Sequence, residues 1–258
     1  MLLREYTKLV EIDELITKVQ EQLSSLYASR AAILQPATPS NNKKTSKLTD
    51  TLADDVKSFV AASEYQRLAQ AWSRYDIEIP AYSQLAKNIT KALNVRTFID
   101  TNTPMLQDKL KLVLCPPAKI LNSKVLSELQ KKHPHLANDD AIQTSLLKTF
   151  KAKKWRLLLV YGEQEGLYMG APEAVIDKSA EILQGYDSLA LGAPEYLALS
   201  LQEKAAFDTD TLTLLPKYGV RQGTIPVVTC KDGTYQFLEE DADTLFGDVR
   251  HRPAIAIA

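Results

Sequence analysis

Two histidines and two carboxylates form the one local group of side chains in the sequence with metal-ligand chemistry. His133 and His135 flank a proline, and Asp139 and Asp140 follow within eight residues. Imidazole nitrogens and carboxylate oxygens both bind zinc and related metals. Their spacing matches no zinc-binding pattern, and the surrounding prolines and polar residues are typical of a loop between helices. We therefore expect Asn138 or Asp139 to cap the next helix, with a metal site as the alternative.

Catalytic signatures are missing from the chain. It contains no GxGxxG, GxxxxGK[ST], GxSxG or HExxH motif, so the sequence predicts no cofactor. Cys115 and Cys230 are too far apart for a CxxC pair, which favours two buried thiols. Catalytic partners need not be close in sequence, so an enzyme stays an open alternative. It would require a pocket that brings His251 or Cys230 to a carboxylate.

Charge and glycine divide the chain at nearly the same place. Residues 1–154 carry a net charge of +7 and residues 155–258 a net charge of −8, which gives −1 overall. All nine glycines lie between Gly162 and Gly247. The overall charge gives no reason to expect nucleic acid or an anionic membrane as a partner. We expect the basic and acidic halves to attract each other within the molecule, with two separate charged partners as the alternative.

Apolar runs along the chain are all short. None approaches the roughly 18 residues that a membrane span needs. The first residues carry early acidic side chains and no continuous apolar segment of the kind found in secretory signals. We expect a cytoplasmic protein that does not associate with a membrane.

The first 35 residues show the strongest periodic pattern. Eight of ten heptad a and d positions are apolar, with no proline or glycine among them, which is typical of a coiled-coil seam. Such a seam predicts an interface with a protein partner or a second copy of the chain. Its residues are Leu2, Leu9, Ile12, Ile16, Val19, Leu23, Leu26 and Ile33.

A polar, proline-punctuated stretch over residues 36–49 predicts a flexible linker after this first helix. Helical spacing then resumes and continues until Pro80. The two helices can fold back as a hairpin within one chain, or they can exchange between chains. We therefore predict a first domain over residues 1–80.

The remaining chain, residues 81–258, predicts an α/β domain with a small sheet. Residues 81–154 are basic and mainly helical, with a helix over 82–94 and a short strand over 109–115. Residues 155–258 are acidic and contain most of the expected strands. The fold class that follows is α+β: an N-terminal helical hairpin or coiled coil, then a mixed α/β domain.

Strands in the acidic part are indicated by several short β-favouring runs. Residues 155–161 predict a buried central strand, and residues 167–169 a return strand. Asp232-Gly233 between two β-favouring runs predicts a hairpin, and the last residues, 254–258, a C-terminal strand.

Two Gly-Ala-Pro-Glu units, at 170–173 and 192–195, predict helix starts in the acidic half. Proline suits the first helical position, and the following glutamate complements the helix dipole. We expect the cluster at 250–252, Arg-His-Arg, to pair with the nearby carboxylates or to be exposed to solvent, with anion binding as the alternative.

The same region resembles a protein family known only as a domain of unknown function. The resemblance covers residues 157–258 and is carried by the apolar strand 157–162, the segment 166–169, Gly185-Tyr-Asp-Ser-Leu189, Glu195-Tyr-Leu-Ala-Leu199 and Gly219-Val-Arg-Gln-Gly223. An aspartate–arginine pair of the family and its later tryptophans have no counterpart in this chain. The resemblance implies a fold but no activity, because none is assigned to the family.

The function class that these patterns favour is a protein-interaction or scaffold module that acts through its N-terminal helices. The alternatives are an enzyme with a site in the C-terminal domain and a nucleic-acid binder that uses the basic half. Catalytic, cofactor-binding and metal-binding residues are not predicted.

Overall fold

The structure is a computed structural model of the whole chain. It divides the chain into two compact units, residues 1–52 and 53–258. The second unit contains nearly all of the described residues. The described residues are 43–121, 151–168, 175–203, 205, 207–218, 223–232, 234–241 and 249–257.

Helices and two small sheets confirm the α+β fold class. The first sheet has three antiparallel strands in the order β1-β2-β7, with Leu157 of β2 opposite both Leu114 and Ile257. The buried run around residue 158 is therefore the central strand, as predicted. The strands of this first sheet are β1 (Leu110–Cys115), β2 (Arg156–Tyr161) and β7 (Ala254–Ile257).

The second sheet has four strands in the order β5-β4-β3-β6. Its central feature is the predicted hairpin, in which Lys231 lies opposite Thr234 and Asp232 takes a positive φ of 52° in the turn. A positive φ at Asp232 is what the first central residue of a type I′ hairpin turn requires. The strands are β3 (Leu212–Leu214), β4 (Thr224–Lys231), β5 (Thr234–Asp241) and β6 (Val249–Arg250).

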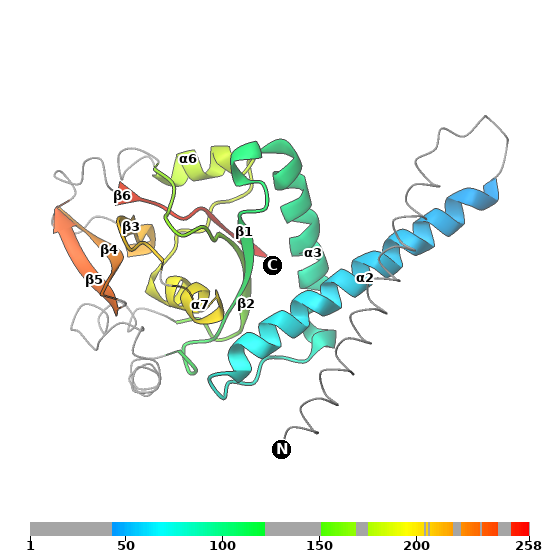
Figure 1. Cartoon of the computed structure of the whole chain (residues 1–258), viewed down its shortest axis with the longest axis horizontal. Helices are drawn as coiled ribbons and strands as arrows, with labels where there is room; N and C mark the ends of the chain where they lie inside the picture. The colour runs from blue at the N-terminus through cyan, green and yellow to red at the C-terminus, as the bar shows by residue number, and fades with distance from the viewer. Residues whose placement is uncertain are drawn as a thin grey trace, which may run out of the picture. The chain divides into compact units, whose positions relative to one another are not determined.

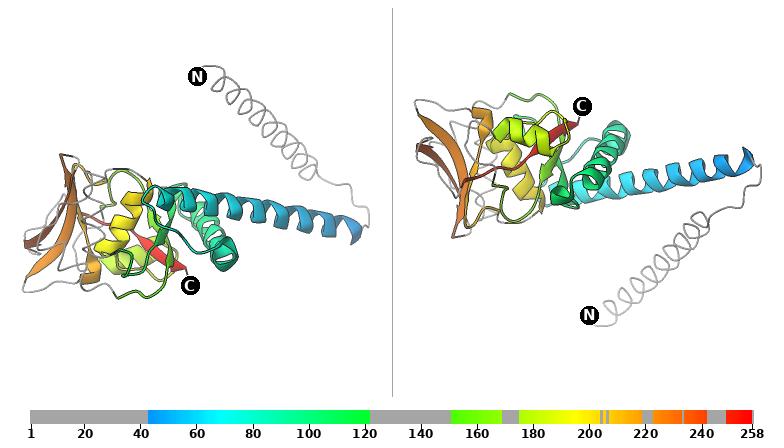
Figure 2. Two further views of the ribbon diagram at one scale, coloured as in Figure 1. Left: turned by 90° about the horizontal axis from the view of Figure 1, so that it is seen from below. Right: turned by 90° about the horizontal axis from the view of Figure 1, so that it is seen from above.

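Helices cover the first sheet. α3 packs against β2 and β7, and α7 packs against β1; the two helices lie on opposite sides of that sheet (Figure 1). In the turned views the β4–β5 hairpin lies at the other end of this unit from α3 (Figure 2). The helices are α2 (Lys43–Ser73), α3 (Tyr82–Asn102), α6 (Val175–Ile182) and α7 (Ala193–Glu203), with short 3₁₀ turns η1 (Pro104–Leu106) and η3 (Pro216–Tyr218).

The last turns of α2 belong to the main hydrophobic core. Leu68 and Trp72 are fully buried, and Tyr75 in the turn that follows the helix is nearly so. Because these side chains pack with the sheet, this part of the chain joins the second unit. α2 also begins within the range predicted as a linker, and α3 extends beyond the predicted range 82–94.

Leu167 and Tyr168 do not begin the return strand predicted over residues 167–169, and Met169 lies outside the described residues. Leu167 makes a single antiparallel bridge to His251, and the chain does not continue as a ladder at Tyr168. The two backbone hydrogen bonds between Leu167 and His251, each 2.8 Å long, hold this segment. Within the described residues, no helix is both long enough and apolar enough to cross a membrane.

Candidate functional site

The candidate site lies at the outer edge of β1, where side chains of neighbouring helices contact the backbone of the strand. Gly162 donates its N–H to the Lys109 carbonyl across the β1–β2 pair, so the even-numbered residues of β1 direct their backbone groups away from β2. The outward carbonyl of Leu114 accepts the Trp72 indole N–H at 3.1 Å, and its N–H donates to Gln202 at 3.0 Å. This end of the edge is closed by α2 and α7.

Arg67 of α2 closes the middle of the same edge. Its Nη2 donates to the Leu112 carbonyl at 2.6 Å, its Nε to Glu64 at 2.9 Å and its Nη1 to Glu203 at 2.9 Å. Each nitrogen of the guanidinium therefore has its own acceptor. Glu64 also accepts from Arg96 of α3 at 3.2 Å, so one carboxylate joins α2 to α3.

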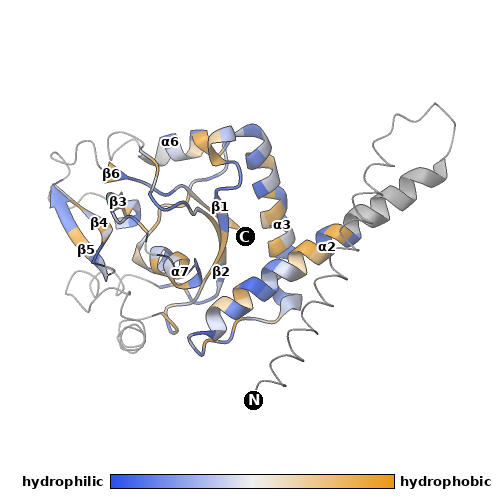
Figure 3. Ribbon diagram, viewed as in Figure 1, coloured by the Kyte–Doolittle hydropathy of each residue, from blue (hydrophilic) through white to orange (hydrophobic). Residues whose placement is uncertain are grey.

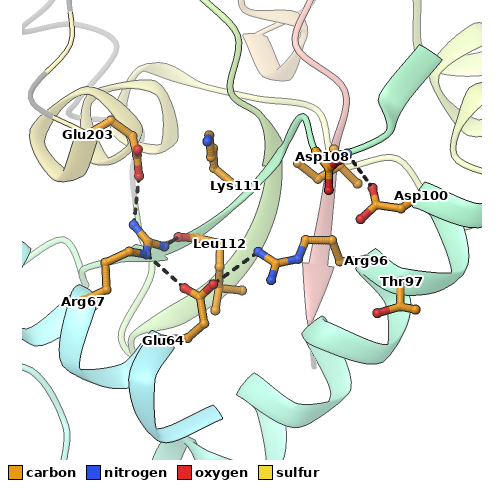
Figure 4. Close-up of a pocket in the computed structure, with 10 residues that line it drawn as sticks. Glu64, Arg67, Arg96, Thr97, Asp100, Asp108, Lys111, Leu112 and Glu203 are labelled. Atoms are coloured by element: carbon orange, nitrogen blue, oxygen red, sulfur yellow. Dashed lines mark hydrogen bonds and ion pairs between the residues drawn. The ribbon is translucent and has the colours of Figure 1, made fainter. Parts of the chain in front are cut away.

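Beyond Arg67 the edge opens into a pocket of about 390 Å³. Side chains from α2, α3, β1 and the end of α7 surround it, as Figure 4 shows. This volume falls within the range of small-molecule sites. We call it the edge pocket, and its lining residues are Glu64, Arg67, Arg96, Thr97, Asp100, Asp108, Leu110, Lys111, Leu112 and Glu203.

Several charged groups in the edge pocket have few partners within the described part of the chain. Arg96 makes one ion pair, to Glu64, and Lys111 makes none. Asp100 accepts the backbone N–H of Asp108 at 3.2 Å. Burial raises the pKa of Asp100, and the Asp108 carboxylate adds to this, while the Asp108 N–H and Arg96 oppose it. The pocket thus contains cationic and anionic groups that can form further ion pairs or hydrogen bonds with a ligand.

An apolar groove of about 300 Å³ lies beside the edge pocket and shares Arg96 and Thr97 with it. Val56 and Val60 of α2 line the groove and are 42% and 38% exposed, and the neighbouring Phe59 is 75% exposed. Figure 3 shows hydrophobic residues of α2 beside the end of α3. We call these three side chains the α2 patch.

A second group of charges is sealed inside the protein. Arg252 and Asp208 are both 0% exposed and form a two-point ion pair at 2.9 Å. Asp208 also accepts the Tyr196 hydroxyl at 2.7 Å and the Gly166 N–H at 2.9 Å. The remaining Arg252 donors bind the carbonyls at 161, 163 and 164. Every strong hydrogen-bonding group of this pair is satisfied, which is the pattern of a structural link.

Glu195, in the first turn of α7, forms a third cluster. It is fully buried and accepts from Arg156 at 2.5 Å and Lys217 at 2.6 Å. Burial by itself favours the neutral acid, but the two cations outweigh burial and hold the pKa of Glu195 below its usual value. Burial raises the pKa of the neighbouring Cys115 to about 12, and the charge of Glu195 adds to this effect. That thiol is therefore not an activated nucleophile.

His251 and Cys230, the residues considered for catalysis, line neither the edge pocket nor the groove. His251 is fully buried, and both of its ring nitrogens lack a hydrogen-bond partner among the described residues. Burial and the nearby Arg252 lower its pKa to about 3, so its imidazole is neutral. A neutral ring without a partner is not positioned to act as a general base.

The predicted site residues within 2–33 and 133–140 lie outside the described residues. These are the metal candidates His133, His135, Asp139 and Asp140, and the interface residues Leu2, Leu9, Ile12, Ile16, Val19, Leu23, Leu26 and Ile33. Within the part of the chain that the structure describes, no group of three or more potential metal ligands occurs.

Sequence reasoning placed Glu195 correctly at a helix start but missed its partners. It also allowed Arg252 to pair with a carboxylate, without identifying Asp208. The edge pocket was missed because its members are spread over four elements. One of its ion pairs, Arg67–Glu203, does join the basic half to the acidic half. The carboxylates of Glu195 and Asp208 instead pair with cations of their own half.

Comparisons with known proteins give no independent assignment. No family model matches the chain, and no curated protein or solved structure is significantly similar to it. The resemblance of residues 157–258 to a domain of unknown function stays a prediction.

Proposed function

We propose that this chain is a protein-interaction module that self-associates through helices. The observation that carries the proposal is the α2 patch, where Phe59 is 75% exposed beside Val56 and Val60. Single exposed apolar side chains are common, but three on adjoining turns beside an apolar groove favour an interface. Leu93 of α3 lies in the same groove, so a partner's side chain has a concave surface to enter.

The energetics favour a helix as the partner. Burying one large apolar side chain contributes about 1.5–3 kcal/mol, so the α2 patch provides only part of a stable interface. The predicted seam over residues 2–33 is a second apolar surface that requires a helical partner. A second copy of the chain supplies a partner for both surfaces, which is why we favour self-association over a different protein.

Sedimentation velocity on the full chain over a range of concentrations tests the proposal. We expect the wild type to form a dimer or larger oligomer, and Phe59→Asp to weaken it about tenfold or more, because a charge at a buried contact is costly. Phe59→Leu should retain association. Met105→Asp is the matched control, because Met105 is 47% exposed and lies outside the groove.

A double variant, Leu9→Asp with Ile16→Asp, examines the predicted seam separately. It should also reduce association while residues 53–258 remain folded by circular dichroism. A wild type that sediments as a monomer at all concentrations would overturn the proposal. Association that survives both Phe59→Asp and the double variant would overturn it as well.

A further inference from the structure

We propose that the edge pocket binds a small zwitterion of the α-amino acid class. In this arrangement the ligand's carboxylate lies between Arg96 and Lys111, and its ammonium group lies toward Asp100 and Asp108. All four side chains line the pocket (Figure 4). This assignment is independent of the self-association proposed above, because it uses the pocket and not the α2 patch.

The first step is that the groups assigned to the ligand are not needed to hold the pocket together. All three guanidinium nitrogens of Arg67 donate hydrogen bonds, to Glu64, Glu203 and the Leu112 carbonyl. Arg96 uses a single donor, in its ion pair with Glu64, and its side chain is 26% exposed. A guanidinium has five N–H donors in its plane, so Arg96 keeps further donors along its edge with which to bind a carboxylate.

Lys111 is the second cation for that carboxylate. It makes no ion pair with any residue that the structure describes, yet its stem is tightly placed. A Cβ built on Gly162 would lie 2.1 Å from the Lys111 Cγ, so only glycine leaves room for this stem. The absence of a side chain at Gly162 therefore positions Lys111 along the pocket wall.

Charge balance decides which class of ligand fits. The lining contains three cations and four carboxylates, so its formal charge is −1. A phosphate or another multivalent anion would meet four carboxylates, and a polyamine would meet the free charges of Arg96 and Lys111. A molecule with one charge of each sign satisfies the free cations and the free carboxylates together.

Backbone geometry decides against an extended peptide. A strand that added to the outer edge of β1 would require the backbone groups of Leu112 and Leu114. Arg67, Trp72 and Gln202 already bind those groups. Only the first part of the edge remains open, in a pocket of about 390 Å³ that suits a small molecule.

Isothermal titration of the full chain with a panel of L-α-amino acids at millimolar concentration tests the proposal. At least one amino acid should bind with a Kd in the micromolar to millimolar range. Its N-acetyl derivative lacks the ammonium charge and its carboxamide lacks the carboxylate. Each derivative should bind about tenfold more weakly, because each loses one charged contact.

Three variants locate the binding. Arg96→Gln and Asp100→Asn should each weaken it about tenfold or more, and Gly162→Ala should weaken it by displacing Lys111. Arg96→Lys, which keeps the positive charge, should lose less than Arg96→Gln. Lys87→Gln, an exposed substitution on the same helix but outside the pocket, is the matched control. Thermal unfolding of each variant shows that the protein remains folded.

Three results would overturn the proposal. The first is that no member of the panel binds the wild type. The second is that an amino acid binds equally well to the folded Arg96→Gln variant. The third is that the N-acetyl derivative binds as tightly as the parent, which would indicate a simple anion site.

Discussion

The sealed Asp208–Arg252 pair and the edge pocket contain the same residue types in opposite settings. Both members of the sealed pair are 0% exposed, whereas Arg67 and Glu203 of the pocket are 38% and 22% exposed. Buried charges are tolerated only when their partners are complete, and the sealed pair meets that condition. Arg67 is fully paired, but Arg96, Lys111, Asp100 and Asp108 keep unused donors and acceptors in the pocket. Completeness of pairing, rather than residue type, therefore separates a structural cluster from a candidate binding site.

Removing one member of the sealed pair should have the largest effect on stability. Asp208→Ala leaves the Arg252 charge buried without its partner, so the free energy of unfolding should fall by about 3–5 kcal/mol. Chemical denaturation of wild type and variant measures the difference. Asp187→Ala, at an exposed position, is the control and should change stability by less than about 0.5 kcal/mol. If Asp208→Ala lowers the free energy of unfolding by less than about 1 kcal/mol, the sealed pair is not a structural link and its contrast with the pocket fails.

Glu195 is an intermediate case, because it is fully buried while Arg156 and Lys217 are about one-third exposed. Glu195→Gln should lower the free energy of unfolding by about 2 kcal/mol. This is less than for Asp208→Ala, because water partly solvates the two cations that remain. The lowered pKa also sets a pH dependence. Glu195 stabilises the fold above its unfolded pKa of about 4.3, and this contribution is lost as pH falls through the folded pKa. Denaturation curves at pH 7 and pH 3 should therefore differ less for Glu195→Gln than for the wild type.

His251 provides a separate pH window. Its folded pKa of about 3 lies below the unfolded value of about 6.5, so the unfolded chain binds the proton first. Stability should therefore fall between pH 6.5 and pH 5, with a slope approaching about 1.4 kcal/mol per pH unit. His251→Leu should flatten that slope in denaturation experiments. The region from pH 7 to pH 8, where His251 is neutral in both states, is the internal control. An unchanged slope in the variant would contradict the burial of a neutral imidazole.

Arg96→Gln should have the smallest effect on stability. Its ion pair to Glu64 is partly exposed, and such pairs contribute about 0–1 kcal/mol. Thermal unfolding should show a shift of only a few degrees or less. The comparison is sharpened if this variant nevertheless loses ligand binding. A loss of stability as large as that of Asp208→Ala would instead make the pocket a structural cluster.

Local patterns predicted much of this fold, and the reasons can be stated for particular elements. The continuous apolar, β-favouring run over residues 157–161 and the Asp-Gly turn at Asp232 depend on neighbours in sequence, so β2 and the β4–β5 hairpin were predictable. Pro194 and Glu195 likewise indicated the start of α7. Leu167 failed as a strand because its pairing depends on His251, 84 residues later.

The candidate site was not predictable, for a related reason. Arg67, Arg96, Lys111 and Glu203 come from four elements, and nothing in their local sequence distinguishes them from solvent-exposed charges. Their grouping depends on how α2 and α3 meet the edge of β1. The α2 patch is similar, since the helical spacing of Val56 and Phe59 predicts an apolar face but not whether the same chain covers it.

Hydrogen–deuterium exchange of the full chain at low and high protein concentration tests the central claim most directly. If α2 is the surface for self-association, amides around residues 53–60 should become more protected as concentration rises, while those of β2 stay unchanged. Phe59→Asp should remove the concentration dependence. Equal exchange of residues 53–60 at both concentrations in the wild type would contradict the proposed function.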